Sequence, residues 1–302
     1  MRADRRGGAP VPRSAVEFGV ASVLALSGLG KDYGDRKAVT AVDLEIEAGM
    51  IVGLLGPNGA GKTTTISMAS GVVTPTRGTA RVDGHDVWTE PYIAKRALGL
   101  VPQELALYDE LTGRQNLRYF GQIYGLAGTE LASRIDWALA VAGLADRANE
   151  PVSQFSGGMK RRLNLAAGVI HKPKLLILDE PTVGVDPQSR NHIFETVKAM
   201  RDEGMTVLYT SHYMEEVEML CDRVAIMDHG VIVAAGTIDE LVADHGGKSI
   251  EIELEDGDVE AARAAAVAAI ESGGARIKKV SSRRGNLEGV FLSLTGKALR
   301  DE

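Results

Sequence analysis

The sequence predicts an α/β protein whose mostly parallel sheet is covered by helices on both faces. Two observations lead to this fold class. Short apolar runs of strand length alternate with segments of helical periodicity along most of the 302 residues. One of these runs, at residues 175–178, is continuously apolar and ends in two acids, as expected of a buried parallel strand that reaches the carboxyl edge of its sheet. Ligands of α/β proteins bind at that edge, so we expect functional residues there.

The composition is that of an ordinary globular protein, with 44% hydrophobic and 25% charged residues. The 34 basic and 41 acidic residues give a net charge of −7. Because nucleic-acid binders usually carry a basic excess, this balance predicts no nucleic-acid partner. No apolar run approaches the roughly 18–20 residues that cross a bilayer, so a membrane role would require a partner chain. The single cysteine, Cys221, excludes an internal disulfide, which suits a reducing cytosol.

Taken in order, the chain begins with 20 residues that are rich in arginine, glycine and proline. They lack the clean apolar stretch of a signal peptide, and we expect a disordered tail or an overextended start. Strands are predicted at residues 23–29 and 39–47, and apolar residues alternate with acidic ones in the second. Between them, residues 31–34 predict a turn that exposes the ring of Tyr33.

The next apolar run, residues 50–55, leads into Gly-Pro-Asn-Gly-Ala-Gly-Lys-Thr and then into a helix predicted at residues 64–69. The loop matches the phosphate-loop pattern of Gly, four free positions and Gly-Lys-Thr. Its glycines allow positive φ, so that successive N–H groups face an anion, and the helix start adds its positive dipole end. Lys62 can reach the β- and γ-phosphates, and the Thr63 hydroxyl can ligate Mg²⁺. An ordinary glycine-rich turn would lack this strand and helix, so we predict a nucleoside triphosphate site at Gly56, Pro57, Asn58, Gly59, Ala60, Gly61, Lys62, Thr63 and Thr64.

Beyond the phosphate loop, strands and helices continue to alternate. Residues 78–83 and the turn after them suggest a short hairpin, and residues 112–143 have a helical pattern broken by glycines. A helix is predicted from Met159 towards His171, with apolar residues on one face and a proline after its end. The remaining strands are predicted at residues 98–101, 175–178, 206–210 and 224–227.

Two acids follow the strand at residues 175–178 and carry the predicted chemistry. Asp179 is placed to hold Mg²⁺ through water, and Glu180 to orient or deprotonate the attacking water. Alone, they would be two solvated acids at a strand end. The phosphate loop upstream favours the catalytic interpretation.

Ser156-Gly157-Gly158, at the start of the helix before this strand, offers a capping hydroxyl, free N–H groups and a helix dipole to an anion. In order with the phosphate loop and the acidic pair, this tripeptide resembles the signature motif of the ABC ATPases, and the resemblance covers about residues 23–240. It implies a P-loop NTPase fold with a RecA-like parallel-sheet core, an antiparallel β subdomain and an α-helical subdomain. It also implies that two ATPs are sandwiched in a head-to-tail dimer, in which Ser156, Gly157 and Gly158 close over the γ-phosphate bound by a second copy.

Four further residues match the family pattern, and the resemblance implies their roles. Tyr33 corresponds to the aromatic residue that stacks on adenine. Gln103 follows a strand and would complete the Mg²⁺ shell while sensing the transmembrane partner. Asp186 fits the loop that crosses the dimer interface, and His212 fits the switch histidine that contacts the γ-phosphate.

Two positions depart from the family pattern, since Phe155 and Met159 stand where the signature usually has Leu and Gln. The serine and both glycines remain, so we expect the γ-phosphate contact to survive. Together with residues 180–187 and 290–296, this signature is similar to that of the type-2 ABC exporter ATPases, which include daunorubicin-resistance and nodulation-factor exporters. The similarity implies ATP hydrolysis that powers export of a drug, lipid or glycan by a separate transmembrane permease, at the cytoplasmic face of the cell membrane.

We predict three parts of the chain: a disordered tail at residues 1–20, an ABC ATPase nucleotide-binding domain at 21–247 with its helical subdomain at about 110–172, and a small α/β accessory domain at 248–302. Strands and helices of the last part are predicted at residues 250–254, 259–272, 275–281 and 287–294. A dimerising or accessory role and a packing appendage both remain open for it.

Three alternative functions remain open. An import ATPase would share these motifs, but the signature and the C-terminal residues resemble exporters. A soluble ABC ATPase acting on DNA or ribosomes would carry a long coiled coil or a second cassette, whereas residues 62–156 hold no heptad array and the chain has one phosphate loop. A nucleotide-dependent binding module without turnover would not need Glu180 or His212.

Overall fold

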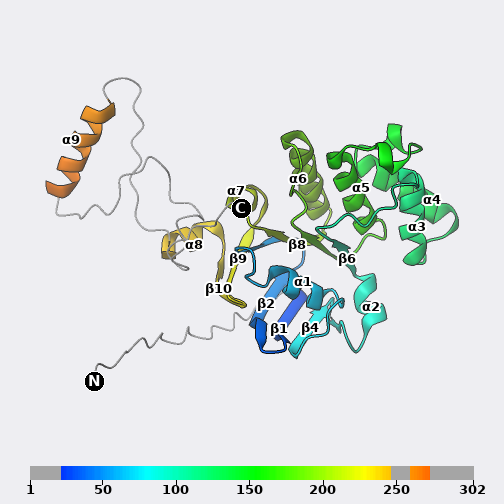
Figure 1. The fold of residues 1–302 in the computed structure, drawn as a ribbon, viewed down its shortest axis with the longest axis horizontal. Coiled ribbons are helices and arrows are strands. Elements are labelled where there is room, and N and C mark those ends of the chain that lie inside the picture. Colours follow the sequence, from blue (N-terminus) through cyan, green and yellow to red (C-terminus); the bar gives the residue numbers. More distant parts are fainter. Residues whose placement is uncertain (1–21, 246–258, 273–302) are drawn as a thin grey trace.

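The computed structural model describes residues 22–245 and 259–272, and the strands within them form one mixed sheet. The strand order is β5-β4-β1-β2-β10-β9-β3-β8-β7-β6. Figure 1 shows the fold that carries these strands. The strands are β1 (Ser22–Tyr33), β2 (Arg36–Glu47), β3 (Ile51–Leu55), β4 (Arg77–Val82), β5 (His85–Asp86), β6 (Leu98–Val101), β7 (Leu175–Asp179), β8 (Thr206–Ser211), β9 (Arg223–Asp228) and β10 (Val231–Gly236). The helices are α1 (Lys62–Ala69), α2 (Pro91–Arg96), α3 (Gly113–Ile123), α4 (Gly128–Val141), α5 (Gly157–Val169), α6 (Pro187–Asp202), α7 (Met214–Leu220), α8 (Ile238–His245) and α9 (Val259–Ser272).

The half of the sheet that carries the predicted site is parallel. Strands β9, β3, β8, β7 and β6 lie side by side and run in one direction. Strands β3 and β7 are buried at every residue. Neighbouring residues of one strand enter different apolar cores: Leu54 packs with residues of α1, and Leu55 with residues of α6 and α7. The continuous apolar runs therefore form strands that are covered on both faces, as predicted.

The carboxyl ends of these parallel strands meet at one edge of the sheet. From there, β3 leads into the phosphate loop, and β6 ends two residues before Gln103. Strands β7 and β8 lead directly into Glu180 and His212. The fold therefore gathers residues that are far apart in the sequence at the edge where α/β proteins bind ligands.

The other half of the sheet is antiparallel, since β1 pairs with β2 and β4, and β4 pairs with β5. The sheet is thus mixed rather than mostly parallel, with the antiparallel unit that the family resemblance implied. The turn predicted at residues 31–34 is wrong, because β1 continues to Tyr33 and the turn lies at Gly34 and Asp35. Arg77 of β4 supports the longer β1 strand, because its guanidinium donates two hydrogen bonds of 2.7 and 3.0 Å to the Asp32 carboxylate.

Helices α3, α4 and α5 pack around an apolar core that includes Leu117, Ile135 and Leu163. The helical pattern predicted for residues 112–143 forms α3 and α4. Thr112 begins the first of these helices in a reciprocal capping box with Gln115. In Figure 1 this group of helices lies beside β6, at the end of the sheet opposite to β5.

Helix α9 spans the helix that the sequence predicts at residues 259–272. The predicted strands at residues 250–254 and 275–281, the predicted helix at 287–294 and the first 20 residues lie outside the described residues. Among the described helices, none combines the length and the apolar character that a bilayer crossing requires.

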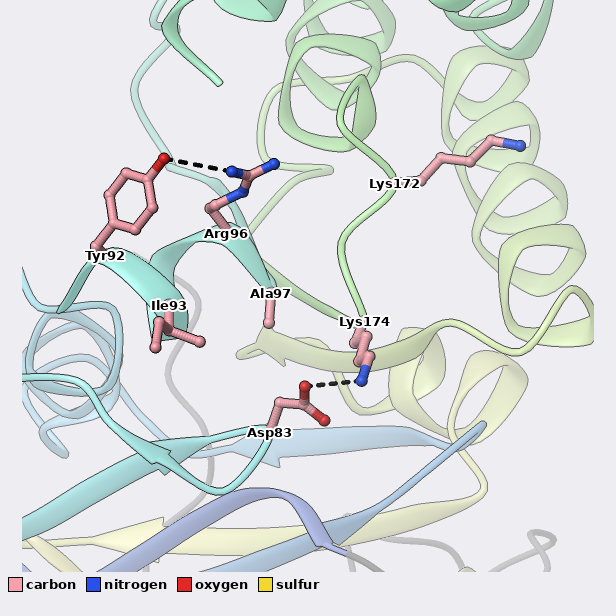
Figure 2. A pocket seen from close by; sticks show the side chains of 7 residues that line it. All are labelled: Asp83, Tyr92, Ile93, Arg96, Ala97, Lys172 and Lys174. Atoms are coloured by element: carbon pink, nitrogen blue, oxygen red, sulfur yellow. Dashed lines mark hydrogen bonds and ion pairs between the residues drawn. The ribbon is translucent and has the colours of Figure 1, made fainter. Parts of the chain in front are cut away.

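A hollow of about 430 Å³ lies at the opposite, amino edge of the parallel strands (Figure 2). Ala97 and Lys174, which help to line it, directly precede β6 and β7. Two of its basic groups already have neighbours, because the Lys174 ammonium contacts the Asp83 carboxylate at 2.7 Å and Arg96 donates to the Tyr92 hydroxyl at 3.3 Å. This hollow is therefore on the far edge of the sheet from the residues predicted to bind phosphate.

Candidate active site

The phosphate loop connects β3 to α1, and at two of its positions the neighbouring backbone leaves no room for a side chain. Gly61 has a φ of 107°, and a Cβ added to it would lie 2.9 Å from the Ala38 carbonyl oxygen. A Cβ on Gly56 would lie 2.3 Å from the Met227 carbonyl oxygen. A larger residue at either position would push the loop away from β2 or β9. The helix begins at Lys62, two residues earlier than predicted.

Lys62 extends from the start of α1 into the interior and is only 4% exposed. Its ammonium donates to the Gly56 carbonyl oxygen at 2.7 Å and forms an ion pair with the Glu180 carboxylate at 3.3 Å. Burial lowers the pKa of Lys62, while the charges of Glu180 and Asp179 oppose this shift. The ammonium is thus held by a carbonyl oxygen and by a carboxylate, an anionic acceptor like the oxygens of a phosphate group.

Asp179 ends β7 and is buried beside Thr210 of the neighbouring strand. The Thr210 hydroxyl donates to the Asp179 carboxylate at 2.8 Å. Burial raises the pKa of Asp179, and hydrogen bonds from the Thr210 and Thr63 hydroxyls only partly offset this. Thr63 and Asp179, two of the residues predicted to hold Mg²⁺, therefore lie together.

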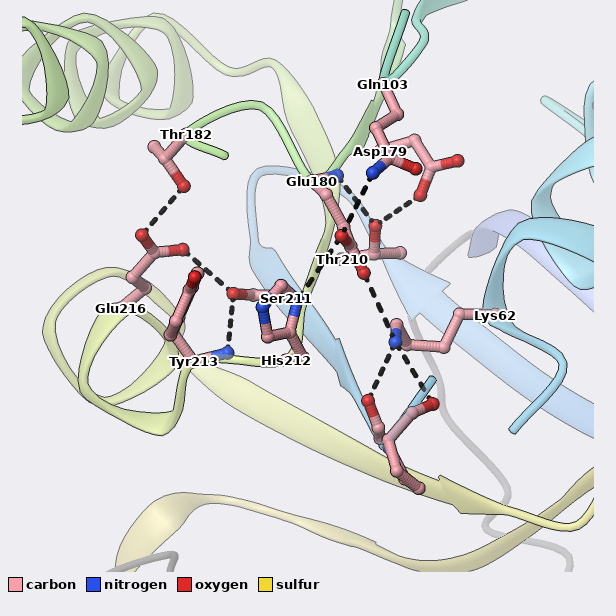
Figure 3. A network of polar contacts seen from close by, with 12 residues as sticks. Lys62, Gln103, Asp179, Glu180, Thr182, Thr210, Ser211, His212, Tyr213 and Glu216 are labelled. Carbon is pink, nitrogen blue, oxygen red and sulfur yellow. Dashed lines mark hydrogen bonds and ion pairs between the residues drawn. The ribbon is translucent and has the colours of Figure 1, made fainter. Parts of the chain in front are cut away.

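The predicted catalytic side chains converge on Glu180 (Figure 3). One carboxylate oxygen of Glu180 lies 3.3 Å from the Lys62 ammonium. The other lies 3.3 Å from Nδ1 of His212 and accepts from the Gln103 amide nitrogen at 3.5 Å. Residues from four separate segments of the chain thus meet at one buried carboxylate.

The backbone of Glu180 has a φ of 47°, a left-handed conformation that costs a non-glycine residue about 1–3 kcal/mol. Its N–H donates to the hydroxyl oxygen of Thr210 at 3.0 Å and to the carbonyl oxygen of the same residue at 3.2 Å. Strand β8 therefore stabilises the turn that follows β7. This turn aims the carboxylate along the sheet edge towards Lys62 and His212.

The signature serine and glycines lie in a second group, at the start of α5. Ser156 caps this helix by accepting from the Met159 N–H at 3.2 Å. Asp186 caps α6 in the same way, accepting from the Ser189 N–H at 2.9 Å, and this bond lowers the pKa of Asp186. The two helix starts touch, because a Cβ on Gly158 would lie 2.1 Å from the Ser189 hydroxyl oxygen and 2.9 Å from the Asp186 carboxylate.

The single chain thus presents the predicted site residues in separate groups. Among the described residues, Ser156, Gly158 and Asp186 make no hydrogen bond or ion pair with Lys62 or Glu180. Tyr33 stands apart from both groups at the end of β1. Its ring is 50% exposed, with the Lys31 ammonium 5.2 Å from the ring centroid.

Two residues that organise the site were not predicted from the sequence. The one hydroxyl of Thr210 donates to the Asp179 carboxylate and accepts from the Glu180 N–H. Glu216 of α7 is buried and accepts hydrogen bonds from Thr182 and Ser211. The only sequence signal for Thr210 is its place as a polar residue near the end of an apolar strand run, two positions before His212. Glu216 carries no such signal, since acids are common in the first turn of a helix.

Known proteins that are similar to this chain indicate its family. The family profile described as ABC transporter matches residues 39–183. The linearmycin resistance ATP-binding protein LnrL of Bacillus subtilis is 43% identical and covers 92% of this chain and 100% of the relative. The daunorubicin resistance ATP-binding protein DrrA3 of Streptomyces coeruleorubidus is 39% identical and covers 91% of this chain and 96% of the relative. A Nod factor export ATP-binding protein I of Cupriavidus metallidurans is 38% identical and covers 93% of this chain and 99% of the relative.

Solved structures lead to the same conclusion. The structure of an ATP binding subunit of an ABC transporter superposes with a TM-score of 0.69 at 30% identity, over 76% of this chain and 96% of that one. This superposition and the mixed sheet confirm the predicted P-loop fold of the ABC ATPase type. The relatives confirm the predicted similarity to drug-resistance and nodulation-factor export ATPases. Because they are this similar along nearly their whole length, the chain belongs to the family of ABC transporter ATP-binding proteins.

Proposed function

We propose that the chain hydrolyses Mg²⁺-bound ATP and so drives export through a separate membrane subunit. ATP binding itself follows from membership of the family. The observation that carries the proposal is the convergence of Lys62, Gln103 and His212 on the Glu180 carboxylate. Such a convergence on one buried carboxylate is expected of a general base and gives no advantage to a module that only binds nucleotide.

The donor set near Asp179 fits Mg²⁺. The Asp179 carboxylate and the Thr63 hydroxyl are hard oxygen ligands, and Gln103 adds an amide group at the same sheet edge. Bound there, the ion would neutralise charge on the β- and γ-phosphates. Burial raises the pKa of Asp179, and a cation beside it would counter this shift by favouring the ionised carboxylate.

In the proposed reaction, Glu180 orients the attacking water and accepts its proton. In the structure, the Lys62 ammonium pairs with this carboxylate at 3.3 Å. When ATP binds, phosphate oxygens would replace Glu180 as the partner of Lys62 and so leave the carboxylate to the water. His212, 3.3 Å from the other carboxylate oxygen, would hold Glu180 in place and reach the γ-phosphate.

The proposal includes a head-to-tail dimer, because the Ser156 group lies apart from Lys62 of its own chain. The start of α5 offers N–H groups and a helix dipole to an anion. A second copy would bring Ser156, Gly157 and Gly158 to the γ-phosphate held by Lys62. Asp186 adjoins Gly158 and would therefore lie at the same interface. The half-exposed ring of Tyr33 is open to stacking by adenine.

We propose that the membrane subunit docks beside Gln103. The exposed apolar side chains of this region are Leu105, Tyr108, Tyr119 and Ile123. The rings of Tyr108 and Tyr119 meet edge to face at 5.0 Å between centroids. Arg161 of α5 donates to the Gln103 carbonyl oxygen, so the segment is attached to the signature helix as well as to Glu180. We place this contact at the cytoplasmic face of the membrane.

The relatives favour export over the alternatives. By name, those described above serve resistance to linearmycin or daunorubicin, or Nod factor export. We therefore propose a drug, lipid or glycan as the class of transported substrate. None of these three relatives is an importer or a DNA or ribosome factor by name, and the net charge of −7 also disfavours a nucleic-acid partner.

The test is capture of the tagged chain from its native membrane, followed by measurement of phosphate release from ATP. We expect an integral membrane protein to be captured with the chain, and hydrolysis that stops when EDTA removes Mg²⁺. Capture of nucleic acid or ribosomes without a membrane protein would contradict the proposed partner. Absence of hydrolysis in the captured complex would contradict the proposed enzyme activity.

A further inference from the structure

Glu216 is a buried carboxylate to which neither the motifs nor the proposed reaction assign a role. It lies in the first turn of α7 and is only 2% exposed. An unpaired buried carboxylate costs several kcal/mol, so its surroundings must supply hydrogen-bond donors or a positive charge. Those groups come from β8, from the segment after β7 and from α6.

One carboxylate oxygen of Glu216 accepts hydrogen bonds from the Tyr209 and Ser211 hydroxyls, both at 2.8 Å. The other accepts from the Thr182 hydroxyl at 2.7 Å and lies 3.7 Å from the Arg190 guanidinium. Burial and the nearby Glu216 charge raise the pKa of Tyr209 well above its ordinary value, so the phenol stays protonated and donates. The carboxylate is therefore the common acceptor for three hydroxyl groups.

These hydroxyls connect Glu216 to the two proposed catalytic residues (Figure 3). Thr182 follows Glu180 by two residues, and Ser211 directly precedes His212. While it donates to Glu216, the Ser211 hydroxyl also accepts from the Tyr213 N–H at 2.9 Å. It therefore fixes the backbone on both sides of His212.

We propose that Glu216 is a positioning residue for ATP hydrolysis, which holds the segments that carry Glu180 and His212 against each other. This inference rests on the proposed function. The Glu180 carboxylate and the His212 ring are 3.3 Å apart, and each is joined to Glu216 through a neighbouring hydroxyl. A displacement of about 1 Å between the segments would break this contact, and misplacement on that scale costs about a hundredfold in rate.

Glutamine cannot replace this carboxylate, although it has the same shape. Its oxygen could still accept from the Tyr209 and Ser211 hydroxyls. Its NH₂ group would then face Thr182 and the Arg190 guanidinium, where the structure places hydrogen-bond donors. Glu216→Gln should thus loosen the segment after Glu180 and leave the core filled.

The test compares Glu216→Gln with Glu215→Gln, since Glu215 is its exposed neighbour on α7. We expect Glu216→Gln to lower kcat by about tenfold to a hundredfold and to leave KM for ATP within about twofold, because the phosphate loop is untouched. Glu215→Gln should keep the wild-type kcat and KM. A loss of folded protein would also lower kcat without changing KM, so the folded fraction and the melting temperature are measured for each variant.

A double variant shows whether Glu216 acts through Thr182. Thr182→Val removes the hydroxyl that connects Glu216 to the segment after Glu180. Added to Glu216→Gln, it should cost much less than the product of the two separate losses, because both substitutions break the same connection. Independent, multiplied losses would place the effect of Glu216 elsewhere and overturn the proposal.

A readout that does not depend on turnover is the His212 imidazole signal in protein labelled with ¹³C-histidine, assigned with His212→Ala. Glu216→Gln should shift this signal, and Glu215→Gln should not. Wild-type protein that hydrolyses no ATP would refute the proposed function. A folded Glu216→Gln variant with wild-type kcat and an unshifted His212 signal would refute the positioning role. If Glu216→Gln fails to fold, Thr182→Val removes one of the same hydrogen bonds at equal volume and is held to the same expectations.

Discussion

Replacing Glu180 with glutamine separates its two proposed roles, as the base for hydrolysis and as the partner of Lys62. The side chains of Lys62 and Glu180 are 4% and 7% exposed and their charged atoms are 3.3 Å apart, so water screens their attraction little. Removing one charge of a buried pair costs about 3–5 kcal/mol in folding free energy. The amide oxygen of glutamine keeps a hydrogen-bond acceptor near Lys62, so we expect a loss of about 3 kcal/mol.

At about 2 °C per kcal/mol for a chain of this size, the melting temperature of Glu180→Gln without nucleotide should fall by about 6 °C. ATP should remove most of this deficit, because phosphate oxygens would then replace the carboxylate as partners of Lys62. Saturating MgATP should therefore raise the melting temperature of the variant by about 6 °C more than that of the wild type. In the same variant, kcat should fall by about 10²–10⁴-fold, because the general base is lost.

Thermal unfolding with and without MgATP, and phosphate release at saturating ATP, measure both effects. Glu203→Gln is the matched control, since Glu203 is an exposed glutamate at the end of α6 and its replacement should change neither quantity. Wild-type turnover in Glu180→Gln would remove Glu180 from the catalytic role. An equal stabilisation of both proteins by ATP would show that Lys62 does not exchange Glu180 for phosphate.

Other substitutions test the phosphate loop, the shared site and one partly buried histidine. Gly61→Ala should abolish ATP binding in equilibrium dialysis, because the φ of 107° and the Ala38 carbonyl 2.9 Å from the new Cβ both oppose it, and wild-type affinity would contradict this. Lys62→Ala and Ser156→Arg should each be nearly inactive, yet their mixture should recover part of the ATPase rate, since a mixed dimer holds one intact site. Full activity of Ser156→Arg at concentrations too low for dimers would rule out the head-to-tail arrangement. Burial lowers the pKa of His171 from 6.5 to about 4, so the folded state binds fewer protons than the unfolded state. Stability should therefore be lost as the pH falls from about 6.5 to about 4, by up to about 3 kcal/mol. Urea unfolding at about pH 7 and pH 4.5 should show this loss in the wild type and much less of it in His171→Gln, whereas equal losses would assign it to other groups.

The features that could be predicted from the sequence depend on local pattern. Strand β6 has the predicted bounds, because its apolar run ends at a proline that cannot continue the ladder. The meeting of Lys62, Glu180 and His212 could be predicted because all three follow or end short apolar runs, and parallel strands bring their carboxyl ends to one edge. The other site residues could be predicted only from motif spacing, through the resemblance to the ABC ATPases.

The features that could not be predicted depend on partners far away in the sequence. The hydroxyl of Thr210 binds Asp179, which is 31 residues away, and Thr182 binds Glu216, which is 34 residues away. Neither pair belongs to a motif with a fixed spacing. Threonine, aspartate and glutamate are also common at the protein surface, so their residue types do not predict buried contacts. The incorrect turn at residues 31–34 has a related origin, because Asp32, a turn-forming residue, accepts two hydrogen bonds from Arg77, which is 45 residues away.

Gly158 shows how one residue can serve a motif and the fold together. The resemblance assigns it to the γ-phosphate of a second copy, but its own chain also requires glycine there, since a Cβ would lie 2.1 Å from the Ser189 hydroxyl oxygen. Ser189 belongs to the first turn of α6, and the next residue, Arg190, lies 3.7 Å from the Glu216 carboxylate. The first turn of α6 therefore touches both the signature helix and the hydrogen bonds that position the proposed catalytic segments. Because glycine at position 158 allows this contact, a larger residue there should disturb both groups of site residues even without nucleotide.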